Sequence, residues 1–241
     1  MTNNILKKTL RSFLILATIS PLASYATAYT PAKFGNAEAV LGKQVTLPAS
    51  LGEGVKTVAV YCQADVMTTG NINSVTCYEN GPLVSMQTVT ESALKSATFT
   101  PATIDGKAVA VRMQLRVVYS LGGTQAPIVL LPNLGTLQAQ HGAHYYAPQE
   151  RLDTGDWYAH YSTKEHGDGK LFFAEGKMTR VMANIEADGK VETVSTIEAA
   201  LRKQEDATSI ESALKKSKFI PGFVQDKPTA MHYIAVVNYQ K

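Results

Sequence analysis

The chain has 241 residues, of which 45% are hydrophobic and 18% charged. This composition excludes a disordered polymer, a collagen-like repeat and a polytopic membrane protein, and the length fits one large domain or two of about 100 residues each. Lys and Arg number 23 against 20 Asp and Glu, and the whole excess lies in Lys7, Lys8 and Arg11. The remaining chain is balanced, which excludes a nucleic-acid partner attracted by net charge.

Residues 1–28 resemble a cleavable secretory signal. A basic segment precedes the apolar run 13–19, and Ala26-Thr-Ala28 supplies the small residues that a signal peptidase needs. The alternative is an uncleaved anchor, but the run is shorter than the roughly 20 residues that span a bilayer. We therefore expect an exported protein of the bacterial periplasm that has no stable membrane span after cleavage.

Cys62 and Cys77 are the only cysteines. Apolar residues alternate along 57–66, which is typical of a strand, and a turn at Thr69-Gly70 would place the two cysteines opposite each other. Opposed strand residues lie within disulfide reach, and an oxidising compartment favours pairing. We predict a structural disulfide, because no Cys-x-x-Cys motif suggests a redox function.

The most informative feature is an internal repeat. Glu91-Ser-Ala-Leu-Lys95 recurs as Glu211-Ser-Ala-Leu-Lys215, and Phe99-Thr-Pro101 matches Phe219-Ile-Pro221 at the same offset of 120. We count 11 identities over 29 ungapped positions, which is too many for chance. The chain therefore contains two related copies.

Each copy predicts a hairpin, a helix and a closing strand. In the first copy these are the strands 57–66 and 72–78, the helix 83–97 and the strand 109–119. The closing strand alternates between an apolar and a mostly polar face, so we expect one face of this sheet to be packed and the other wet.

In the second copy the predicted strands 178–187 and 190–197 flank an Asp188-Gly189 turn, a strong hairpin signal. A helix at 207–217 and a strand at 229–239 follow. The predicted fold class is α+β, with two tandem units at 29–120 and 121–241. The second unit carries an aromatic-rich insertion around 136–176.

The stretch from Ser92 to Val109 resembles the TonB carboxy-terminal domain, and the likeness covers most of 55–120 and 178–240. In the first copy the pattern that carries the likeness consists of an aromatic-x-Pro-Ala step and a polar corner, made by Phe99, Pro101, Ala102, Asp105, Gly106 and Lys107. The second copy keeps Phe219, Pro221 and Lys227 of this pattern. The family's Pro-rich spacer is absent, so the resemblance does not imply energy transduction.

The resemblance implies a mode of recognition. In that family the terminal strand receives an extended peptide from an outer-membrane receptor by strand addition, which needs an open sheet edge. The alternative is that these strands pair with each other or pack away. The candidate binding residues on the matching strands are Arg112, Gln114, Arg116, His232, Ile234 and Val236.

The insertion gathers aromatic side chains, which suit a recognition loop because rigid rings give contact area at low entropic cost. The alternative is that these rings cover the interface between the two copies. The candidate residues are Tyr145, Tyr146, Trp157, Tyr158 and Tyr161.

Signals for catalysis are weak. No nucleophile elbow, phosphate loop or His-Glu-x-x-His motif occurs. Because Glu91 and Glu211 lie in predicted helices, we expect them to have capping or solvated-face roles and not to act in acid/base catalysis. A metal site would have to be recruited by folding from a dispersed set of histidines and aspartates: His141, His144, Asp153, Asp156, His160, His166 and Asp168.

The leading hypothesis is an exported, non-enzymatic envelope protein without a cofactor that binds a protein partner, such as an outer-membrane receptor. Two alternatives stay open. One is a periplasmic metal-dependent or hydrolytic factor that uses the insertion. The other is a structural module that self-associates through its sheet edges.

Overall fold

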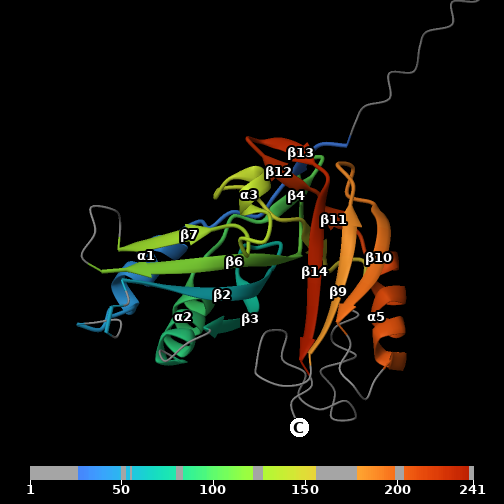
Figure 1. The fold of residues 1–241 in the computed structure, drawn as a ribbon. Helices are drawn as coiled ribbons and strands as arrows, with labels where there is room; N and C mark the ends of the chain where they lie inside the picture. Colours follow the sequence, from blue (N-terminus) through green and yellow to red (C-terminus); the bar gives the residue numbers. More distant parts are fainter. Residues whose placement is uncertain are drawn as a thin grey trace, which may run out of the picture.

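The structure is a computed structural model that describes residues 27–49, 53–54, 56–79, 84–121, 127–155, 178–198 and 204–238. Nearly all of the predicted signal and much of the insertion lie outside these residues. The described chain is mixed α+β with mostly antiparallel sheets (Figure 1). Within it, no helix has the length and apolar character needed to cross a membrane.

The first half of the chain is a hairpin, a helix and a long strand, preceded by a short N-terminal helix. The long strand β6 pairs with β2 over its whole length, and β2 pairs with β3. The helix α2 packs against β3. In chain order the elements are β1 (Tyr29–Thr30), α1 (Ala37–Gln44), β2 (Thr57–Val66), β3 (Ile72–Glu79), α2 (Val84–Ser96), β4 (Ala102–Ile104), β5 (Lys107–Val109) and β6 (Val111–Ser120).

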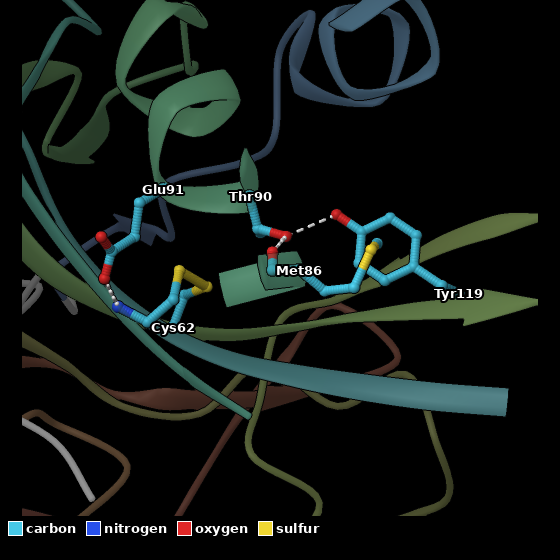
Figure 2. The surroundings of a disulfide bond; sticks show 6 residues. Cys62, Met86, Thr90, Glu91 and Tyr119 are labelled. Atoms are coloured by element: carbon cyan, nitrogen blue, oxygen red, sulfur yellow. Dashed lines mark hydrogen bonds between the residues drawn. A yellow bond between two sulfur atoms is a disulfide. The ribbon is translucent and has the colours of Figure 1, made fainter. Parts of the chain in front are cut away.

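The predicted hairpin register is confirmed. Cys62 lies opposite Cys77 and Ala64 opposite Val75, and the two cysteines form a disulfide with a Cα–Cα distance of 4.1 Å. The bridge lies beneath α2, whose Glu91 reaches down to it (Figure 2). Both sulfur-bearing residues are buried in the main hydrophobic core, so the disulfide connects two strands from inside the protein.

A connector follows β6 and leads to the second hairpin, helix and strand. Its elements are β7 (Ile128–Leu131), α3 (Gln138–His141) and β8 (Gln149–Arg151). The later elements are β9 (Met178–Ile185), β10 (Val191–Glu198), α5 (Gln204–Lys216), β11 (Phe219–Ile220), β12 (Gly222–Val224), β13 (Lys227–Thr229) and β14 (Met231–Asn238).

The strands β10, β9 and β14 form a separate antiparallel sheet, against which α5 packs. They run across the direction of the first sheet (Figure 1). In both halves the predicted closing strand is divided, at Ala110 and at Ala230, because a short hairpin precedes the long strand.

The two halves are joined through the connector. The short strand β8 pairs with β6 on one side and with β11 on the other, so β11 extends the first sheet. Ile220 and Phe223, from the second half, belong to the hydrophobic core of the first.

The expectation of a wet face on the first sheet is wrong. Polar residues of that face are covered where the second half packs against it. Arg112 Nε donates a hydrogen bond to Asp65 Oδ1, and Gln114 Nε2 donates one to the Ile234 carbonyl of the second half. Gln63, Asp65, Arg112 and Gln114 are only 1–8% exposed.

Candidate functional site

The strand β6 has partners on both sides. It pairs with β2 throughout, and on its other side with β8 at residues 111–112 and with β7 at 116–119. Of the candidate residues on β6, Arg112 and Gln114 are buried, and Arg116 donates a hydrogen bond from Nη2 to Gln138 Oε1 at 2.6 Å. The first candidate edge is therefore occupied by this chain's own strands.

The strand β14 is paired differently. Among the described residues it pairs only with β9. The carbonyl of Ile234 accepts a hydrogen bond from Gln114 Nε2 at 2.9 Å, so this residue points its backbone groups away from β9. Because backbone direction alternates along a strand, His232 and Val236 point theirs the same way. His232 is exposed, Ile234 half-buried and Val236 buried.

The outer edges of the two hairpins are closed by the repeated glutamates. Glu91 Oε1 accepts a hydrogen bond from the Cys77 amide at 2.6 Å, and Glu211 Oε1 accepts one from the Thr196 amide at 2.7 Å. Each helix thus caps an outward-facing amide of its own hairpin, which blunts that sheet edge. Both glutamates are half-buried, so they do not lie on a solvated face, and the groups that they cap are strand amides.

A buried ionic cluster lies where the halves meet. Arg112 Nε donates to Asp65 Oδ1 at 2.9 Å, and Arg112 Nη1 lies 3.5 Å from Glu150 Oε2. Ser217 Oγ donates to Glu150 Oε1 at 2.8 Å. Burial opposes the charge of Arg112, but the two carboxylates outweigh it and raise its pKa. The cluster is buried, and it joins β2, β6 and β8 to one another.

Tyr233 of β14 completes this junction. It is 2% exposed, and burial raises its pKa well above the ordinary value, with the charge of Glu150 adding to the effect. The phenol therefore stays neutral beside the ionic cluster.

An open pocket of about 230 Å³ lies at the start of β14, next to α3 and the tip of the β9–β10 hairpin. His232 Nδ1 lies 2.5 Å from Asn184 Oδ1, and Asn184 Nδ2 donates to Thr193 Oγ1 at 2.6 Å. The pocket is lined by Leu137, Gln140, His141, Asn184, Ile185, Glu186, Glu192, Ala230, Met231 and His232.

The sequence predictions identified His141 and His232 but missed the pocket's other polar residues. Asn184, Glu186 and Glu192 come from a hairpin that the sequence marked only as structural. Their sole signal is their position at polar sites around the Asp188-Gly189 turn, which does not say what lies opposite.

Only part of the aromatic insertion lies in the described residues. Tyr145 is 2% exposed, and its hydroxyl accepts a hydrogen bond from the Leu137 amide at 3.1 Å. Tyr146 is half-buried, and its backbone pairs with Phe223. The Tyr145 ring packs in a small cluster with Ala147 and Met231, and Tyr146 packs against the main hydrophobic core. The other candidates, Trp157, Tyr158 and Tyr161, lie outside the described residues.

Only some of the candidate metal ligands lie in the described residues. His141, His144 and Asp153 are described, and Asp153 is paired with Arg151, whose guanidinium lowers its pKa. His160, His166, Asp156 and Asp168 lie outside the described residues. In the part of the chain that the structure describes, no group of three or more His, Cys, Asp or Glu could hold a metal ion.

Function therefore has to be inferred from the β14 edge and the pocket beside it. No protein-family model, curated protein or solved structure matches this chain.

Proposed function

We propose that the chain is an exported protein of the bacterial cell envelope that binds a protein partner, and that β14 receives an extended segment of this partner by strand addition. The observation that carries the proposal is the contrast between β6 and β14. One side of β6 pairs with β7 and β8. The equivalent side of β14 pairs with no strand among the described residues. Outward N–H and C=O groups are all that strand addition needs.

The order of elements in the two halves supports a pair of tandem units resembling the TonB carboxy-terminal domain. Each half has a hairpin, a helix, a short hairpin and a long strand at corresponding positions. In that family the strand that closes the unit is the recognition strand, and β14 closes the second unit among the described residues. An outer-membrane receptor is the partner that the resemblance suggests.

Export is supported by the amino-terminal sequence and by the cysteines. The disulfide between Cys62 and Cys77 is the state that cysteines adopt in oxidising compartments such as the periplasm. The reducing cytosol would oppose it.

Gln114 has a defined part in this proposal. It occupies the position equivalent to Ile234 in the first copy, and its amide holds the Ile234 carbonyl. A partner strand would take over this acceptor with a backbone amide, so we expect Gln114 to be displaced on binding.

The test is affinity capture with crosslinking, using residues 29–241 as bait in a native envelope extract. Ile234→Pro removes the outward amide of β14 and leaves the ladder with β9 intact, because proline is tolerated at an open edge. Ile234→Ala is the matched control, since it removes the same side chain but keeps the amide. Wild type and the alanine variant should recover the same outer-membrane protein, and the proline variant should lose it.

Hydrogen exchange then locates the contact. In the recovered complex the amides of His232, Ile234 and Val236 should exchange more slowly than in the free protein. Equal capture by the proline variant, recovery of the chain itself alone, or unchanged exchange at these amides would contradict strand addition at β14.

A further inference from the structure

The pocket beside β14 has two chemically distinct parts. Ile185 and Met231 are 1% and 4% exposed and form a buried apolar wall, to which the half-buried Leu137 adds. Glu186 is half-buried and Glu192 exposed, so the carboxylates lie nearer the solvent. No lysine or arginine is among the described residues that line the pocket. This arrangement favours a ligand with an apolar stem and a positive end.

The two histidines add hydrogen-bond acceptors. Because Asn184 Nδ2 donates to Thr193, its Oδ1 is the acceptor for His232 Nδ1–H, and in this Nδ1–H tautomer Nε2 is an acceptor. Nε2 of His141 is buried and has no hydrogen-bond partner among the described residues. A buried polar atom without a hydrogen-bond partner costs free energy, and a ligand that brings a hydrogen-bond donor into the pocket would provide that partner.

The size and ligand set favour a single side chain. A volume of about 230 Å³ is below the roughly 300–1,000 Å³ of pockets that enclose drug-sized ligands. A metal ion is disfavoured, because the described acidic and histidine side chains do not converge closely enough to hold one.

We propose that this pocket binds the side chain of a lysine or arginine in the partner segment that pairs with β14. The proposal rests on the proposed function, and it adds a specificity: the segment carries a basic residue near the start of β14. His232 belongs to both sites, since its backbone faces the open edge and its ring lines the pocket. The alkyl stem packs on Ile185 and Met231, and the charged end meets Glu186 and Glu192.

The test uses fragments that have no peptide backbone, so that it does not depend on strand addition. The probes are n-butylammonium, n-butanol and pentanoate, which share a butyl stem and differ in charge. They are titrated into residues 29–241 while NMR follows the rings of His141 and His232 and the methyl groups of Ile185 and Met231. We expect saturable shifts with n-butylammonium and at least fivefold weaker binding of the other two.

Two double variants distinguish binding at the pocket carboxylates from a general effect of the protein's negative charge. Glu186→Gln with Glu192→Gln should weaken n-butylammonium at least fivefold, whereas Glu38→Gln with Glu53→Gln, at exposed positions outside the pocket, should leave it unchanged. Equal shifts with all three probes, or equal effects of the two double variants, would overturn the pocket proposal. Strand addition is tested separately, by capture with Ile234→Pro and Ile234→Ala, so the failure of one proposal can be distinguished from the failure of the other.

Discussion

Tyr119 and Thr90 share a hydrogen bond of 2.7 Å in the first core, close to the disulfide (Figure 2). Thr90 Oγ1 donates its only proton to the Met86 carbonyl at 2.5 Å, so the phenol of Tyr119 must be the donor to Thr90. The tyrosine is fully buried, and burial raises its pKa from 10.0 to about 12. The folded protein therefore holds this proton more tightly than the unfolded chain does.

This difference predicts alkaline destabilisation. Below pH 10 the phenol is neutral in both states, and the stabilisation is complete. As the pH rises from 10 towards 12, the unfolded chain ionises while the folded protein does not, so up to about 3 kcal/mol of unfolding free energy is lost.

Urea unfolding of wild type and Tyr119→Phe at pH 8, 10 and 11 checks this prediction. The phenylalanine variant should lose less stability between pH 8 and 11 than the wild type. Parallel losses in the two proteins would show that Tyr119 does not govern this range.

At the level of the elements, the tip of each hairpin is tied to the segment that follows the helix. The amide of Phe99 donates to the Gly70 carbonyl at 2.8 Å, and the amide of Phe219 donates to the Gly189 carbonyl at 3.2 Å. Gly70 and Gly189 have φ of 83° and 78°, and a Cβ on either would lie 2.1–2.2 Å from a phenylalanine carbonyl oxygen. Both the turn and this close approach require glycine.

Gly189→Ala should therefore lower the unfolding free energy by about 2 kcal/mol or more, since the added methyl meets backbone that cannot move freely. Gly42→Ala is the matched control, because Gly42 lies in α1 with open space around its Cβ position. This control should be neutral or stabilising by up to about 1 kcal/mol. Chemical denaturation gives both values, and similar costs at the two sites would refute the argument.

At the level of the whole molecule, the hydrophobic core and the ionic cluster of the first half are completed by residues from outside that half. Ile220 and Phe223 fill the first core, and the Arg112 cluster includes Asp65 from β2 and Glu150 from the connector. Removing one partner of such a buried ion pair costs about 3–5 kcal/mol, because the remaining charge is left uncompensated. Separating the halves would expose these groups together.

We therefore expect residues 29–241 to unfold in one cooperative transition. The calorimetric and van't Hoff enthalpies should agree, and the slowest-exchanging amides of β2 and β9 should report the same free energy of opening. Two resolved transitions, or clearly different opening energies for the two strands, would show that the halves unfold independently.

The sequence predicts local features of this protein well. The register of Cys62 and Cys77 follows from period-two alternation and one turn, and the Asp188-Gly189 hairpin follows from its turn residues. Burial of the polar face of β6 and the pocket were not predictable in this way. Their residues come from segments far apart in sequence, and no local pattern records which distant polar groups meet.

The junction between the halves has a consequence for the order in which this protein folds. Residues 219–238 follow the first half in the chain, and they supply the final strand of the first sheet, two residues of its core and the tyrosine beside its ionic cluster. Without them the first half would present an open apolar core and exposed internal charges. We therefore expect native packing of the first half to depend on contacts that are distant in sequence, which form late in folding because closing a long loop costs entropy.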